Sequence, residues 1–136
     1  DNTLGAERSI VHSSAGGGSL RHQVEGGAVR GSNLFHSFRE FNIPEGQTLY
    51  FQSSSDIRNI ISRVTGGNPS TIEGTLGTVG STANVFLLNP RGILFGANAR
   101  LDVKGSFVAT TATAIQFGTQ GFFSSSTPDV PSLLTI

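Results

Sequence analysis

The 136-residue sequence has no cysteine, methionine or tryptophan, and only 13% of its residues are charged. Without cysteine, the chain holds no disulfide framework, thiolate zinc site, iron–sulfur cluster or cysteine nucleophile. Basic and acidic residues balance at nine each, which argues against a nucleic-acid binder. The longest apolar run, Val85–Leu88, is far shorter than the roughly 18 residues of a membrane helix, so we expect no stable membrane insertion. Because no methionine begins the chain, we expect a removed segment or a cloning boundary before Asp1.

Small and polar residues dominate instead. Glycine, serine, threonine and asparagine make up 41% of the chain, a composition typical of turns and strands rather than helices. Leucine, isoleucine, valine and phenylalanine supply a further 29%, which is enough for a core and excludes disorder as the default. The length fits one domain, residues 1–136.

The N-terminal region contains short strand patterns between glycines. Ser9–His12 and Ser19–Glu25 are candidate strands, and the second alternates apolar and polar residues with a period of two. Gly16–Gly18 separates them, so an antiparallel pair is plausible. Thr48–Gln52 has high β-propensity and is also predicted to be a strand.

Two segments have ambiguous periodicity. Phe35, Phe38 and Phe41 are spaced by three, which fits one side of a helix, a 3₁₀ turn, or a chain that winds around the edge of a core. Residues 57–65 place isoleucine and valine at helical spacing, yet the segment is rich in β-branched residues and also alternates. We predict a strand over residues 59–65 and keep a helix as the alternative.

From residue 70 onward, short strands alternate with corners of one to four residues. Corners that short cannot hold a crossover helix, and asparagine–glycine hairpin signals are absent from this stretch. Small residues at corners with aliphatic and phenylalanine residues between them indicate a parallel β-helix. The predicted interior stack consists of Ile72, Leu76, Val85, Leu87, Ile93, Phe95, Leu101, Val103 and Phe107.

The tail, residues 121–134, is predicted to be an irregular wrap. Phe122 and Phe123, followed by Leu133 and Leu134, fit a cover over one end of the coil. The alternative is that the chain leaves the domain here toward a longer partner segment.

The sequence lacks recognisable catalytic or cofactor chemistry. The three histidines have no metal-binding spacing, and phosphate-binding and nucleophile-elbow motifs are missing, so we predict no enzyme, no cofactor and no metal site. His36 is predicted to be a hydrogen-bonded structural residue. The segment Asn89–Pro90–Arg91–Gly92 is a strong turn signal. It is either simply a good turn or an exposed corner presented to a partner.

An ordered series of motifs carries a family resemblance. The series consists of residues 33–42 (NLFHSFREFN), 60–66 (IISRVTG), 72–76 (IEGTL) and 84–96 (NVFLLNPRGILFG). It resembles the N-terminal secretion domain, or TPS domain, of filamentous haemagglutinin-type exoproteins of two-partner secretion. The form with Phe-His-Ser-Phe, and with Gly-Ser-Phe-Val-Ala-Thr-Thr-Ala at residues 105–112, looks cyanobacterial.

The resemblance implies an all-β fold. It implies a right-handed parallel β-helix with an N-terminal capping region of short strands and some antiparallel extra strands. We therefore expect N-terminal strands and a cap over residues 1–50, the β-helix core over 51–120, and a C-terminal wrap or exit over 121–136.

The resemblance also implies site residues. The family's Asn-Pro-Asn-Gly motif maps to Asn89, Pro90, Arg91 and Gly92, followed by Ile93, and the third position departs from it. A second family motif, Asn-Pro-Asn-Leu, has no counterpart, because Asn68–Pro69 matches only two letters. The N-terminal family motif consists of Asn33, Phe35, His36, Ser37, Phe38 and Phe41, which we expect to be structural.

The function implied is that of a non-catalytic, monomeric secretion domain. It would target a large exoprotein to an outer-membrane transporter of the Omp85 (TpsB) type by binding the periplasmic POTRA domains. It would then nucleate β-helix folding at the cell surface or outside the cell. The alternative is an adhesin or carbohydrate-binding β-helix module, although the chain has one tyrosine and no tryptophan for stacking on sugars.

Overall fold

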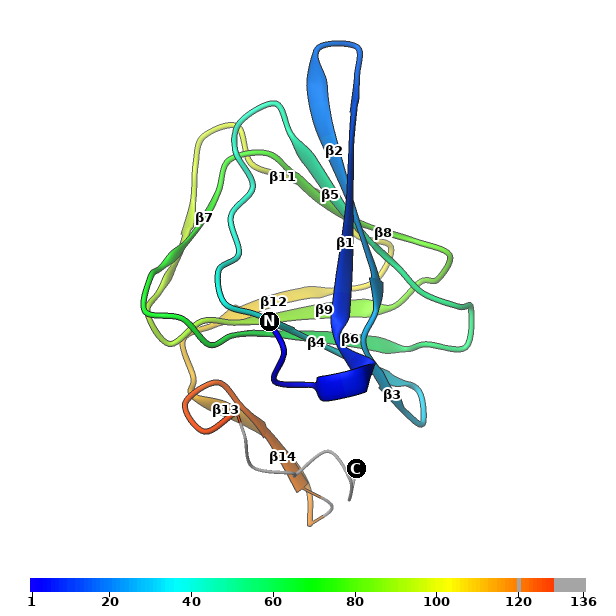
Figure 1. The fold of residues 1–136 in the computed structure, drawn as a ribbon, viewed down its shortest axis with the longest axis vertical. Coiled ribbons are helices and arrows are strands. Elements are labelled where there is room, and N and C mark those ends of the chain that lie inside the picture. The colour runs from blue at the N-terminus through cyan, green and yellow to red at the C-terminus, as the bar shows by residue number, and fades with distance from the viewer. Residues whose placement is uncertain (120, 129–136) are drawn as a thin grey trace.

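The described chain winds into a coil with three faces, seen nearly end-on as a triangle in Figure 1. The structure is a computed structural model, and it describes residues 1–119 and 121–128. Face A consists of β1 (Ser9–Gly16), β2 (Ser19–Gly26), β5 (Thr48–Gln52), β8 (Thr75–Val79) and β11 (Arg100–Asp102). Face B consists of β3 (Ala28–Arg30), β4 (Asn33–Phe38), β6 (Asn59–Val64), β9 (Asn84–Leu88) and β12 (Phe107–Thr110). Face C consists of β7 (Ser70–Ile72) and β10 (Ile93–Phe95).

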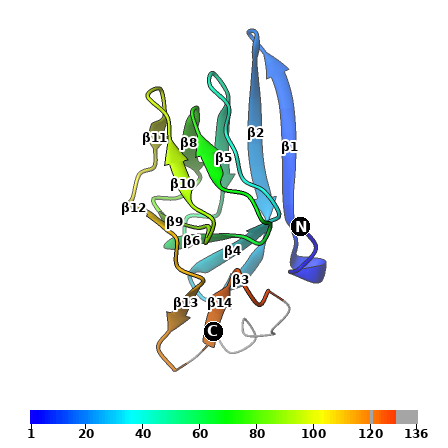
Figure 2. The same ribbon diagram turned by 90° about the vertical axis from the view of Figure 1, so that its left-hand side faces the viewer.

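The coil confirms the predicted parallel β-helix. The chain visits faces B, C and A in turn, and each strand pairs in parallel with the strand one coil earlier, as in β4–β6–β9–β12 and β2–β5–β8–β11. Figure 2 shows these rungs side by side. A short 3₁₀ turn, η1 (Gly5–Glu7), and the antiparallel pairs β1–β2, β3–β4 and β13–β14 are additions to the coil.

The N-terminal hairpin is longer than the sequence predicted. Strand β1 continues to Gly16, and Gly16 pairs with Ser19, so the connection has only two residues. These are Gly17 and Gly18, which have φ values of +61° and +82°. Two successive residues with positive φ are what a tight two-residue hairpin turn requires, and glycine adopts them without strain.

The two ambiguous segments are strands. Residues 59–64 form β6, as predicted, with Ile60 and Val64 in the interior and Ile61 on the outer side of face B. The phenylalanine segment begins as β4, so the helical reading of its spacing is wrong. Phe35 points to the outer side of face B, whereas Phe38 packs inside the coil.

The interior is a stack of apolar ladders. Leu34, Ile60 and Val85 are in register across face B, and Ile43, Ile72 and Phe95 are in register across face C. Burying one Leu or Phe side chain contributes roughly 1.5–3 kcal/mol. Of the predicted stack, four residues are fully buried: Ile72, Leu76, Val85 and Leu87. Ile93, Val103 and Phe107 are partly buried against the same core.

Phe95 and Leu101 depart from the predicted burial, because they are 47% and 52% exposed. Leu101 is in register with the fully buried Leu76, and Phe95 with the fully buried Ile72. Both therefore continue interior ladders, but they belong to the last described coil. Their exposure arises because no further coil of the described residues covers them.

A second apolar cluster lies outside the coil. Strands β13 (Ala114–Phe117) and β14 (Gly121–Ser124) form an antiparallel hairpin against the outer side of face B. Phe123 is fully buried there, 4.8 Å between ring centroids from Phe35. The prediction that the tail covers an end of the coil is wrong for Phe123, because the apolar outer side of face B attracts it. Leu133 and Leu134 lie outside the described residues.

Candidate functional site

The turn at residues 89–92 joins β9 to β10 at the corner between faces B and C. The amide nitrogen of Gly92 donates to the carbonyl of Asn89 at 3.0 Å, and Gly92 has a φ of +116°. The Asn89 Oδ1 atom accepts from the Arg91 amide at 2.9 Å, as expected of asparagine at a turn start. The sequence-predicted turn is therefore formed.

Asn89 also links this coil to the previous one. Its side chain is fully buried, and its Nδ2 atom donates to the Asn68 carbonyl and to Ser70 Oγ, both at 3.0 Å. Every polar atom of the side chain is thus used inside the molecule. Asn68 takes part in this link through its backbone carbonyl.

The other turn residues are more accessible. Pro90 and Ile93 are partly exposed and Arg91 is exposed. The turn uses the amide of Arg91 rather than its side chain. The change from the family's asparagine at this position therefore leaves the turn geometry intact.

Asn33, the first residue of the N-terminal motif, begins an asparagine ladder. Asn59 Nδ2 donates to Asn33 Oδ1 at 3.0 Å, and Asn84 Nδ2 donates to Asn59 Oδ1 at 3.2 Å. The ladder ends on the Ser106 amide, which donates to Asn84 Oδ1 at 2.8 Å. Each asparagine begins a strand of face B, at separations of 26 and 25 residues. That recurrence is visible in the sequence and corresponds to the number of residues in one coil.

His36 lies in the interior between the rings of Phe38 and Phe51, at centroid distances of 6.0 and 5.4 Å. Its Nδ1 atom is 2.8 Å from Ser9 Oγ, which also accepts from the Ser37 amide at 3.1 Å. The other ring nitrogen, Nε2, is buried and has no hydrogen-bond partner among the described residues. Burial lowers the pKa of His36 to about 4. In this structure His36 is a buried imidazole that is neutral at pH 7 and hydrogen-bonded through Nδ1.

Ser37 and Arg63 join three parts of the chain. Arg63 is 2% exposed, and its guanidinium donates to Ser37 Oγ at 2.9 Å, to Thr3 Oγ1 at 3.0 Å and to the Ser124 carbonyl at 3.0 Å. Its Cζ atom lies 4.3 Å from the centroid of the Phe123 ring, a cation–π contact. The N-terminal segment, face B and the β13–β14 hairpin therefore meet at this arginine, which the sequence analysis did not single out.

The end of the N-terminal motif, at Phe38, lies at the same corner of the coil as the turn, whereas Asn33 lies at the opposite end of face B. Phe38 pairs with Val64 at the end of β4 and β6, and Arg63 pairs with Leu88 just before the turn. Pro90 and Arg91 line a hollow of about 380 Å³ together with Thr65 and Ser125. Phe41 is buried in the adjacent interior, with its ring parallel to that of Phe51 at 6.1 Å.

The contacts described above hold separate parts of the fold together. In residues 1–119 and 121–128, no group of three histidine or acidic side chains is placed to hold a metal ion. Within the same residues, no helix has the length and apolar character to cross a membrane.

The sequence model of the TPS secretion domain family matches residues 1–135, nearly the whole chain. The chain belongs to the TPS secretion domain family. It is also 35% identical over 75 residues to the heme/hemopexin-binding protein of Haemophilus influenzae. That match covers 54% of this chain and 8% of the relative's length. No solved structure matches the chain.

Membership of this family defines the general role of the TPS domain described here. A TPS secretion domain implies targeting to a TpsB transporter of the outer membrane, and exoproteins with such a domain are secreted. TPS domains are secretion modules rather than known enzymes.

Proposed function

We propose that this TPS domain directs an exoprotein to its outer-membrane transporter by binding the periplasmic POTRA domains, and then nucleates folding of the following chain at the cell surface. The domain acts as a monomer and without catalysis. The observation that carries the targeting part is the family match over residues 1–135. The nucleation part rests on the last coil of the structure.

The topology supports a chain that stays unfolded while it is recognised. Each rung of the coil pairs with a strand one complete coil away, as Leu49 does with Leu76. Folds built on such non-local pairing form slowly, because the conformational entropy of loop closure is lost before the stabilising contacts form. An extended segment of the unfolded chain can then add to the edge of a POTRA sheet by β-augmentation.

The last coil supports the role of a folding template. The ladder Leu49–Leu76–Leu101 changes from 7% and 0% exposed to 52% exposed at its last member. Phe95, which continues the interior ladder of Ile43 and Ile72, is 47% exposed at the same end. The backbone edges of β10, β11 and β12 and these side chains form a surface on which a further parallel coil can stack.

Binding to the isolated periplasmic part of the transporter tests the targeting step. The 136-residue chain is diluted from urea into a solution of the POTRA domains, and capture is compared with that of the refolded chain. We expect capture of the unfolded chain and weaker capture of the refolded one. No capture in either state would contradict POTRA binding.

A further inference from the structure

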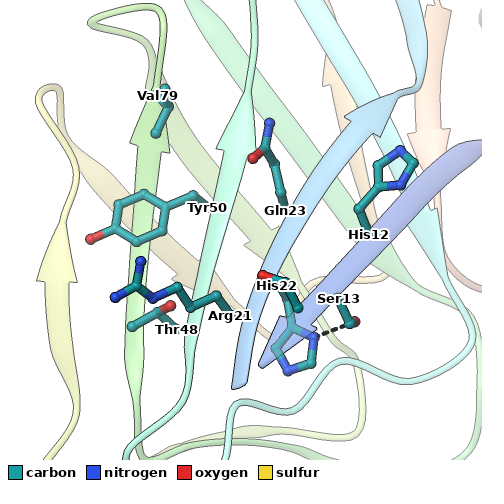
Figure 3. A pocket seen from close by; sticks show the side chains of 9 residues that line it. His12, Ser13, Arg21, His22, Gln23, Thr48, Tyr50 and Val79 are labelled. Carbon is teal, nitrogen blue, oxygen red and sulfur yellow. Dashed lines mark hydrogen bonds between the residues drawn. The ribbon is translucent and has the colours of Figure 1, made fainter. Parts of the chain in front are cut away.

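A groove runs over the outer side of face A. Its volume is about 570 Å³, and residues of β1, β2, β5 and β8 line it. Figure 3 shows its side chains, with Tyr50 and Arg21 next to each other. The groove lies on the outer side because Val24 and Leu49, which alternate with its residues, point into the core.

Tyr50 forms a flat platform in this groove. An added Cβ at Gly77 would lie 2.3 Å from Tyr50 Cε1, so the ring rests directly on the glycine of the neighbouring strand. The phenol donates to Asp102 Oδ2 at 2.9 Å, which fixes the ring across β8 toward β11. Burial, together with this bond to Asp102, raises the pKa of the phenol. The other ring face is turned toward the groove (Figure 3).

Polar groups with spare bonding capacity surround the platform. Arg21 is exposed, and its guanidinium makes no hydrogen bond or ion pair with any described residue. Thr48, its register partner on β5, has a hydroxyl that likewise lacks a described partner. Gln23 donates its amide nitrogen to Glu25 Oε1 at 3.1 Å and to Gln52, so its carbonyl oxygen is left for a ligand.

The charges facing the groove favour an anionic ligand near Arg21. Asp102 does not belong to the groove lining; its carboxylate keeps its charge and accepts from the Tyr50 hydroxyl. Glu25 accepts from Gln23, and its other oxygen is 3.2 Å from His12 Nε2. Among the described residues that line the groove, Arg21 is the one arginine or lysine, and none is acidic. A planar guanidinium binds carboxylate or sulfate through two parallel hydrogen bonds.

We infer that this groove binds an acidic polysaccharide, with a sugar ring stacked on Tyr50 and its carboxylate or sulfate paired with Arg21. The C–H groups on one face of a pyranose complement the negative face of an aromatic ring, and convergent donors and acceptors fix its orientation. Thr48 and Gln23 supply an O–H donor and a carbonyl acceptor for sugar hydroxyls. This goes beyond the secretion role, since it concerns the folded domain after export.

The single tyrosine provides a direct readout, because the chain has no tryptophan. The folded 136-residue chain is titrated with polygalacturonate oligomers, dextran sulfate and neutral dextran while tyrosine emission is followed. We expect a saturable change with one or both acidic sugars and none with dextran. The carboxylated and sulfated arms distinguish the two sources of charge. An unchanged emission with both acidic sugars, or an equal response to dextran, would overturn the inference.

Variants separate a built site from general charge attraction. Arg21→Gln should weaken binding by about tenfold, as measured by calorimetry, because a charge-assisted contact is lost. Arg58→Gln makes the same charge change at an exposed residue outside the groove and serves as the matched control. Tyr50→Phe should retain binding and Tyr50→Thr should abolish it. Equal weakening by Arg21→Gln and Arg58→Gln, or full binding by Tyr50→Thr, would overturn the inference.

Discussion

The Nδ1 atom of His36 lies 2.8 Å from Ser9 Oγ, so the first strand of the hairpin is attached to the interior of the coil through a neutral imidazole. His36 is fully buried between aromatic rings, and burial lowers its pKa to about 4. The histidine of the family motif therefore acts as a buried neutral ring that is held by one hydrogen bond.

His36 should make the stability of the domain depend on pH. Its folded-state pKa of about 4 lies below the value of about 6.5 in an unfolded chain. The contribution is therefore complete above pH 6.5 and is lost as pH falls toward 4, by about 3 kcal/mol in total. Urea unfolding at several pH values measures this slope.

The variant His36→Gln should lose most of that pH dependence, whereas His12→Gln on the exposed hairpin should keep it. In the native protein, NMR should find the His36 imidazole still neutral at pH 5. A His36 ring that titrates near pH 6.5 would contradict the assignment.

Arg63→Lys should destabilise the domain by about 2 kcal/mol. One ammonium cannot reach Ser37, Thr3 and the Ser124 carbonyl from the positions that the guanidinium nitrogens occupy. We expect amide protection to fall first in β13 and β14, measured by hydrogen exchange. Arg58→Lys is the exposed control and should change neither quantity. Unchanged protection of β14 in Arg63→Lys would rule out the proposed link.

Asn89→Ala should lower the free energy of unfolding by about 2 kcal/mol, because the Asn68 carbonyl and Ser70 Oγ lose a buried partner. Arg91→Asn, which restores the family motif, should change it by less than about 0.5 kcal/mol, since the turn uses only the backbone of that residue. Thermal and urea unfolding of both variants make the comparison. If Arg91→Asn proved the more damaging, the side chain at this position would have a role that the turn geometry does not explain.

A charged substitution at the open end of the coil should affect the stability of the domain much less than one in the interior. Leu101→Asp should leave the stability of the 136-residue chain nearly unchanged, because the side chain is already 52% exposed. Leu76→Asp, at the buried register partner, should unfold it. In the full exoprotein, Leu101→Asp should delay protease resistance of the segment that follows. Normal acquisition of resistance would contradict the template role.

The sequence predicted the coil because its corners are too short for anything but a hairpin or a bend to the next face. It also located most of the stack, since inward residues such as Ile72 and Val85 alternate with outward ones. It misjudged the burial of Phe95 and Leu101. The alternation of apolar and polar residues indicates which way a side chain points, but not whether a further coil covers it. It misjudged Phe123 because the outer side of face B is apolar, which becomes visible only when β4, β6 and β9 are aligned.

The site was predictable in part for a similar reason. The turn at Asn89 has a strong local signal, so its geometry followed from residue types alone. The role of Arg63 depends on Thr3 and Ser124, each about 60 residues away, and no local pattern predicts that contact. The platform of Tyr50 depends on Gly77 one coil later. Contacts of this kind require the register of the coil, which the sequence alone did not provide.

Secretion of the full exoprotein with residues 1–136 deleted tests the central claim most directly. The deletion variant and the native exoprotein are expressed with the same transporter, and the exported fraction is quantified. The account predicts that the deletion abolishes export. It also predicts that export returns when the 136-residue segment is added back at the N-terminus. Export of the deleted exoprotein at the native level would contradict the assignment of this domain as the secretion address.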